Sequence, residues 1–181
     1  MIWESFYWKS DLLKHAGVLK KRIRQKRWPD ASLARCEQTI MLGFYSIRKL
    51  TESAKLTDHV SKMNVSIRSY RATGQTVHLL NKHRLDELYD LDNAKRRSVS
   101  LPYLSSQIVH SYVFSLLFDE DNQLAGILVT SDRDRSKELL EVPIQKIIEV
   151  FEKVGKDEAN VAVTFRFDDK KGDWIYKFAK D

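Results

Sequence analysis

The spacing of hydrophobic residues changes once along this chain, and the change limits the folds open to it. Up to about residue 55, apolar residues recur every three or four positions, which is the period of an amphipathic helix. Beyond residue 63 they alternate with polar neighbours in short runs, which is the period of a β-strand. Helical segments followed by strand segments, without βαβ alternation, indicate an α+β fold.

Two long helices are expected in the first 55 residues. The apolar face of the first helix consists of Trp8, Leu12, Ala16, Leu19 and Ile23. A Trp-Pro-Asp sequence at 28–30 separates the helices, because proline disfavours a helical conformation in the residue before it. Asp30 or Ser32 can then cap the second helix, whose apolar stripe starts at Leu33. A connection this short predicts an antiparallel helical hairpin.

The remaining residues predict an antiparallel sheet made of hairpins. Paired strands are expected at 63–69 with 77–80, at 111–118 with 123–130, and at 161–167 with 174–179. The first of these hairpins would turn at Gly74, and residues 138–142 would add another strand. One amphipathic helix, 143–154, is expected to pack on the sheet, and Pro102 is expected to open a shorter helix. Residues 92–98 are expected to form a polar loop.

The chain is expected to form a single domain, 1–181. It has only six glycines and three prolines, with no low-complexity linker and no repeat of 20–50 residues. Two sub-lobes can be distinguished within it: the helical hairpin, 1–56, and the sheet with its helices, 57–181.

A single cysteine, Cys36, bears on the cellular setting. It excludes an intrachain disulfide and a zinc site of several cysteines, which favours a reducing, cytoplasmic location. The longest apolar stretch, 112–118, is too short to cross a bilayer, and the N-terminal residues do not form the pattern of a signal peptide. We therefore expect a cytoplasmic protein without a transmembrane segment.

The positive charge of the chain is concentrated at its start. Residues 1–28 hold eight Lys or Arg against two acidic residues, an excess equal to the net charge of +6 of the whole chain. The candidate binding residues are Lys20, Lys21, Arg22, Arg24, Lys26 and Arg27. Such clusters bind phosphate backbones through charge and counterion release, although a solvated helix face or an anionic membrane surface would also suit them.

The leading hypothesis is a non-enzymatic accessory or regulatory protein whose basic first helix contacts nucleic acid or an acidic protein. An alternative is an obligate subunit, in a homo- or hetero-oligomer, that docks through the aromatic N-terminus formed by Trp3, Phe6, Tyr7 and Trp8. No cofactor is expected under either hypothesis.

A second alternative is enzymatic and rests on His110. This histidine follows the helix that Pro102 opens and has Ser106, Gln107 and Ser111 as sequence neighbours. A partly buried imidazole among hydroxyl and amide groups can act as a general acid or base near neutral pH. His110 is thus the candidate catalytic residue of a small ribonuclease or hydrolase, and a structural histidine is the competing interpretation.

Metal-dependent and nucleotide-hydrolysing activities have little support in the sequence. The acidic turn at 119–122 starts like a calcium loop, but Leu124 stands where such a loop requires glycine. Asp168 and Lys170 have the spacing of half a metal-nuclease motif, which short acidic turns often share. There is no Walker A, G-x-G-x-x-G, G-x-S-x-G, H-E-x-x-H or paired C-x-x-C motif. No metal ligands are predicted, and the balance is against an enzyme.

Overall fold

The computed structural model describes residues 2–158 and 163–178. The longer helices are α1 (Ser5–Arg22), α2 (Asp30–Glu52), α5 (Leu101–Val109) and α6 (Ile144–Gly155), and the shorter ones α3 (Asp58–Ser61) and α4 (Leu85–Leu88). The strands are β1 (Asn64–Arg71), β2 (Lys95–Ser100), β3 (Ser111–Phe118), β4 (Leu124–Ser131), β5 (Glu138–Pro143), β6 (Val163–Asp168) and β7 (Asp173–Phe178). The expected α+β fold is confirmed.

The first two helices pack together as their apolar faces predict. Leu12, Ala16 and Leu19 of α1 are buried, and the stripe of α2 is buried from Cys36 to Leu50. Helix α6 packs along α1, and the ring of its Phe151 meets the ring of Phe44 of α2 at 5.4 Å between centroids. The N-terminal helices therefore share one core with a helix from the far end of the chain.

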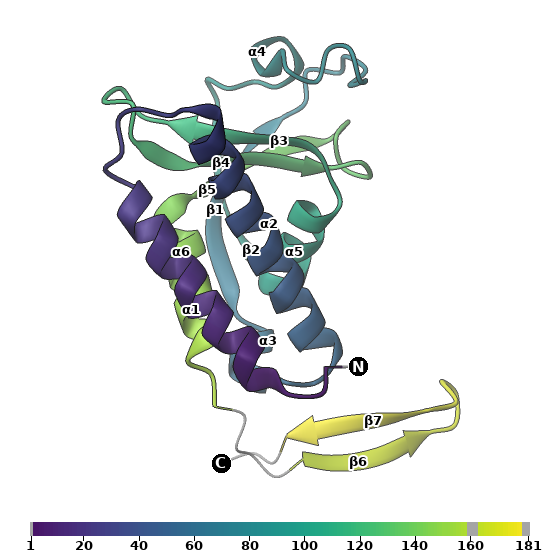
Figure 1. Cartoon of the computed structure of the whole chain (residues 1–181). Helices are drawn as coiled ribbons and strands as arrows, with labels where there is room; N and C mark the ends of the chain where they lie inside the picture. The colour runs from purple at the N-terminus through teal and green to yellow at the C-terminus, as the bar shows by residue number, and fades with distance from the viewer. Residues whose placement is uncertain (1, 159–162, 179–181) are drawn as a thin grey trace.

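Five strands form one antiparallel sheet in the order β2-β1-β5-β4-β3. The four longer helices lie together on one side of this sheet, with α5 and α6 against the strands and α1 and α2 packed on them (Figure 1). A second, smaller core lies on the other side. It joins Tyr70 and Leu139 of the sheet to Val77, Leu88 and Tyr89 of the segment between β1 and β2.

The predicted hairpin around Gly74 is wrong, although Gly74 does lie in a turn with φ of +97°. Strand β1 pairs with β2 and β5, and residues 77–80 form no strand. Residues 72–94 instead make a long excursion that carries α4, seen at the top of Figure 1. Of the apolar residues at 77–80, only Val77 is buried and anchors this segment, whereas Leu79 and Leu80 are exposed.

The predicted polar loop at 92–98 is also wrong in its second half, because Lys95 begins strand β2. Five of the six residues of β2 are exposed, so the strand lacks the apolar alternation that reveals a half-buried strand. It is an edge strand, and charged side chains are typical of such edges because they discourage pairing with other chains.

Strands β6 and β7 form the last predicted hairpin, in register from Val163 opposite Phe178 to Asp168 opposite Asp173. The outer ends of the two predicted runs, 161–162 and 179, lie outside the described residues. Figure 1 shows this hairpin beyond the ends of α1 and α6 where the N-terminus also lies. Among the described helices, none is both long and apolar enough to cross a membrane.

Candidate nucleic-acid interface

The basic segment at 20–27 is only partly helical, because α1 ends at Arg22 and the residues from 25 to 29 are irregular. Two of its six cations are engaged inside the molecule. The Lys20 ammonium pairs with Glu152 of α6 at 2.6 Å, and the Arg22 guanidinium donates to Gln25 and to Ser32 Oγ. Lys20 and Arg22 therefore help to hold α1 against α6 and α2.

The other four cations, Lys21, Arg24, Lys26 and Arg27, are exposed. Lys21 belongs to α1, and the loop with the other three is fastened to the β3–β4 turn: the Trp28 indole N–H donates to the Asn122 carbonyl at 2.9 Å, and the Asn122 amide donates to the Lys26 carbonyl at 2.7 Å. This turn contains the acidic run at 119–121. The loop cations consequently lie next to a turn with three carboxylates, which weaken their attraction for an anionic partner.

His110 lies at the C-terminal end of α5, where it is exposed rather than partly buried as expected. The guanidinium of Arg48, on α2, donates to its Nε2. Arg48 is itself paired with Glu52 at 2.7 Å. The fold thus brings an arginine to His110 from 62 residues away in the chain, but leaves the imidazole without the buried, hydroxyl-lined surroundings of the prediction.

Gln107, a sequence neighbour of His110, has a structural role. Its buried amide donates to Asp134 Oδ2 at 2.6 Å, and its Oε1 accepts the N–H of Ser131 at 2.9 Å. Lys137 donates to the same carboxylate at 2.6 Å, and this bond holds the pKa of Asp134 below its usual value. Gln107 and Asp134 therefore tie α5 to the β4–β5 turn.

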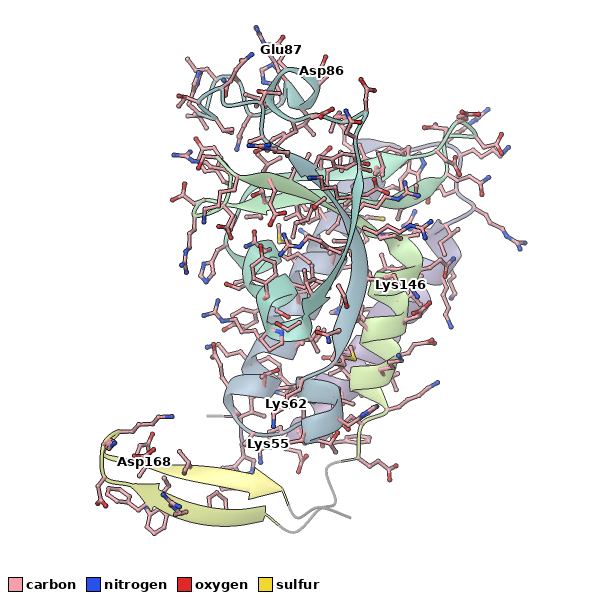
Figure 2. All side chains as sticks on the ribbon, turned by 180° about the vertical axis from the view of Figure 1, so that it is seen from behind. Lys55, Lys62, Asp86, Glu87, Lys146 and Asp168 are labelled. Atoms are coloured by element: carbon pink, nitrogen blue, oxygen red, sulfur yellow. The ribbon has the colours of Figure 1, made fainter. Side chains whose placement is uncertain are left out.

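A larger basic surface, which the sequence analysis did not predict, lies on β1 and β2. Strand β1 contributes Arg68 and Arg71, and β2 contributes Lys95, Arg96 and Arg97. Lys137 stands just before β5, and Lys146 lies in the first turn of α6. We call these seven residues the sheet-edge basic surface; Figure 2 shows the molecule from the side on which Lys146 is seen.

Four of the seven cations have acidic partners. Arg68 pairs with Glu141 at 3.3 Å, Lys137 with Asp134 and Lys146 with Glu149, while Arg97 contacts Glu138. The other three, Arg71, Lys95 and Arg96, have no carboxylate within ion-pair distance in the described part of the chain. All three are exposed. Positive charge is therefore left uncompensated at this edge of the sheet.

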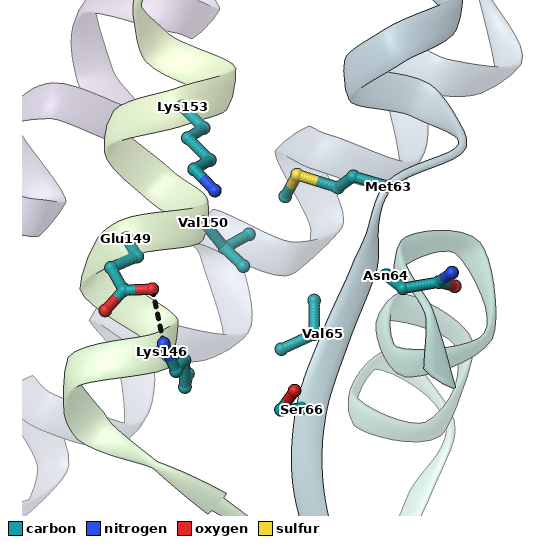
Figure 3. Close-up of a pocket in the computed structure, with 8 residues that line it drawn as sticks. All are labelled: Met63, Asn64, Val65, Ser66, Lys146, Glu149, Val150 and Lys153. Carbon is teal, nitrogen blue, oxygen red and sulfur yellow. Dashed lines mark hydrogen bonds and ion pairs between the residues drawn. The ribbon is translucent and has the colours of Figure 1, made fainter. Parts of the chain in front are cut away.

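Two open grooves run along this surface. One, of about 520 Å³, is lined by Ser66, Ile67, Arg68, Arg96, Arg97, Ser98, Pro143 and Lys146. The other, of about 360 Å³, is lined by Ser69, Arg71, Lys95, Arg96, Arg97, Lys137 and Glu138. The grooves share Arg96 and Arg97, so they adjoin at β2. A third and smaller groove, of about 110 Å³, lies between β1 and α6 and also includes Lys146 (Figure 3).

Tertiary structure creates this surface, because its residues come from four separate segments. The run Lys95-Arg96-Arg97 was visible in the sequence, but it was read as part of a loop. Arg68 and Arg71 lie in an alternating run whose partner strand was predicted incorrectly. Two basic runs in adjacent antiparallel strands would have been the signal, had the pairing of 64–71 with 95–100 been known.

The predicted carboxylate turns show no metal-site geometry. Within residues 2–158 and 163–178, no three His, Cys, Asp or Glu side chains gather closely enough to hold a metal ion. Asp134, in the turn between β4 and β5, is occupied by its bonds to Gln107 and Lys137.

Searches against protein-family models, curated proteins and solved structures found no match to this chain. Function must therefore be argued from the residues and their arrangement.

Proposed function

We propose that this protein is a non-enzymatic accessory protein that binds nucleic acid through the sheet-edge basic surface. The observation that carries the proposal is a group of three cations on two adjacent strands, Arg71 and Lys95 on one face of the sheet and Arg96 on the other, that have no acidic partner in the described part of the chain. This moves the predicted contact from the first helix to the sheet, although the Asp90 N–H donates to the Arg71 carbonyl at 2.9 Å and so places an acidic residue near this edge too.

The chemistry of the surface suits a phosphate backbone. Arginine presents several N–H donors that match phosphate oxygens, and lysine supplies a mobile point charge. Serine hydroxyls at Ser66, Ser69 and Ser98 add neutral donors along the same grooves. The grooves are open and lined by several cationic side chains, so they support recognition of charge and shape rather than of base sequence.

The test compares two triple variants with equal loss of charge. One carries Arg71→Gln, Lys95→Gln and Arg96→Gln on the sheet; the other carries Arg24→Gln, Lys26→Gln and Arg27→Gln in the loop. Fluorescence anisotropy with labelled single- and double-stranded oligonucleotides at about 50 mM salt should show at least about tenfold weaker binding for the sheet variant. The loop variant should lose much less.

Failure of the wild-type protein to bind any oligonucleotide at low salt would overturn the proposal. A larger loss in the loop variant would return the contact to residues 20–27, as the sequence predicts. Circular dichroism of both variants should match the wild type, since all six side chains are exposed.

A second candidate function is an assembly subunit that docks through its aromatic N-terminus. Trp3 is 96% exposed, and Phe6 and Tyr7 are also largely exposed at the start of α1. Trp8 packs against the core instead and does not belong to this surface. Light scattering should then show an oligomer that Trp3→Ser with Phe6→Ser converts to a monomer; a monomeric wild type would count against self-assembly.

The ribonuclease alternative keeps one supporting contact, between Arg48 and His110. An arginine beside a histidine can stabilise the charge that develops on phosphate while the imidazole moves a proton. Exposure of His110 and the use of its Nε2 by Arg48 argue against it. We expect no RNA cleavage that His110→Ala removes; cleavage lost in that variant would make the protein an enzyme.

A further inference from the structure

Four side chains on β1 and β2 form a small square array on one face of the sheet. Ser66 lies directly opposite Ser98, and Arg68 lies directly opposite Arg96. Directly opposite residues point to the same face, and so do residues two apart on one strand. Two hydroxyls and two guanidinium groups therefore line the same groove, about 520 Å³ in volume.

The opposed arginines are unfavourable for the fold itself. Like charges placed directly opposite each other destabilise a pair of strands, and Glu141 compensates only Arg68. The Glu141 carboxylate is also occupied by the hydroxyl of Tyr70. Arg96 has no carboxylate within ion-pair distance in the described part of the chain. An arrangement that costs stability in the free protein is typical of a site that meets an anion.

Helix α6 adds a third source of positive potential at the same groove. Pro143, its N-cap, and Lys146, in its first turn, both line the groove. No side chain caps this N-terminus and no acidic residue lies in its first turn, so the helix dipole there is not offset. Figure 3 shows Lys146 beside Ser66 across the gap between α6 and β1; Lys146 also pairs with Glu149 at 2.7 Å.

We propose that Arg68, Arg96 and Lys146, with Ser66 and Ser98, form a binding site for one phosphate group. Arg96 is the principal ligand because its charge is unpaired, and Arg68 and Lys146 approach from the neighbouring strand and helix. This inference deepens the proposed function, on which it rests for the source of the phosphate, a nucleic-acid backbone.

The shift in Tm on thermal unfolding measures phosphate binding at this site, with inorganic phosphate as the probe and chloride at equal ionic strength as the reference. Wild-type protein should gain about 5 to 10 °C in Tm at a phosphate concentration about 100 times the Kd. Arg96→Gln should abolish this gain, and Lys146→Gln should reduce it. In chloride alone, Arg96→Gln should unfold at the same temperature or about 1 to 3 °C higher, because the opposed charges are relieved.

Arg35→Gln is the matched control, since Arg35 is an exposed arginine of α2 without an acidic partner in the described part of the chain. It should keep the full response to phosphate. Absence of a saturable gain in the wild type, or its persistence in Arg96→Gln, would overturn the phosphate site.

The same unfolding experiment with an oligonucleotide distinguishes the phosphate site from the proposed nucleic-acid binding. If an oligonucleotide also raises the Tm in an Arg96-dependent way, both proposals are supported. If phosphate alone acts and no oligonucleotide binds, the phosphate site stands, its ligand is a free phosphate compound, and the nucleic-acid function fails. If oligonucleotides bind while phosphate has no effect, the function stands and the phosphate site fails.

Discussion

Gly43 shows how one residue fixes the distance between two helices. It lies on the buried side of α2, and a Cβ placed there would overlap the ring of Phe151 from α6. The aromatic ring fills the space that a side chain would take. Helices α2 and α6 can approach this closely only because the residue is glycine.

We predict opposite effects for two glycine-to-alanine changes in helices. Gly43→Ala should lower the free energy of unfolding by about 1 to 3 kcal/mol, because the ring of Phe151 must move. Gly17→Ala should raise it by about 0.5 to 1 kcal/mol, since nothing lies within 4 Å of its added Cβ and alanine favours the helix. Denaturant unfolding of both variants measures the difference, and shifts of the same sign would contradict the packing described.

Asp134 makes the stability of the folded protein depend on pH, in a direction that its contacts define. Hydrogen bonds from Lys137 and Gln107 favour its ionised form, so its pKa in the folded protein is below the usual 3.8. Its contribution to stability is therefore complete above about pH 4 and is lost as the pH falls through the lowered folded pKa. Acid unfolding followed by circular dichroism should show a shallower decline below pH 4 for Asp134→Asn, and an unchanged decline would contradict this assignment.

At the scale of elements, the 72–94 excursion depends on a few anchors. Tyr89 is fully buried, and its hydroxyl donates to the Arg135 carbonyl at 2.8 Å. The Thr73 N–H donates to the Leu88 carbonyl, and Ala72 forms a β-bridge with Tyr89. The excursion thereby covers the sheet around Tyr70 but leaves Arg68 and Arg96 open to solvent.

We predict that Tyr89→Phe loosens this segment without unfolding the protein. Losing one buried hydrogen bond should cost about 0.5 to 1.5 kcal/mol, which corresponds to roughly three- to tenfold faster exchange of protected amides in the excursion. Hydrogen exchange at Thr73 is the measurement. Tyr45→Phe is the control, because Tyr45 is exposed on α2; equal acceleration in both variants would count against the anchor.

The edge strand β2 shows why the sequence did not reveal every strand. A strand reveals itself in sequence when one face is buried, and in β2 only Val99 is buried. The four longer helices and β3 to β5 were predictable because their apolar patterns match the local periods. The partner of β1 was not predictable, because the turn at Gly74 suggested a local hairpin whereas the true neighbours, β2 and β5, are distant in sequence.

At the scale of the whole molecule, the segment that holds the net charge is not the surface that we propose binds anions. Residues 1–28 hold the entire charge excess, yet the loop that carries Arg24, Lys26 and Arg27 is fastened to an acidic turn. The rest of the chain is neutral in total, yet three of its cations on β1 and β2 have no acidic partner among the described residues. A neutral total therefore conceals a local surface that can bind anions.

Salt dependence distinguishes these two surfaces. Three phosphate contacts by Arg71, Lys95 and Arg96 predict that log K falls with log salt at a slope of about −2 to −3. Arg96→Gln should reduce the slope by about 1. A slope near about −5 would instead correspond to six contacts, as expected for the whole segment 20–27. Anisotropy titrations over a series of salt concentrations measure both slopes.

The amino-acid sequence by itself determined the helical hairpin, most of the strands, helix α6 and the absence of common catalytic motifs. These features follow from local periodicity, because residues close together in the chain form each period. Only the tertiary structure decided that Arg68 lies opposite Arg96, that Arg48 meets His110, and that the acidic turn lies against the basic loop. Such contacts join distant segments, and they depend on which strands and helices pack together rather than on any local pattern.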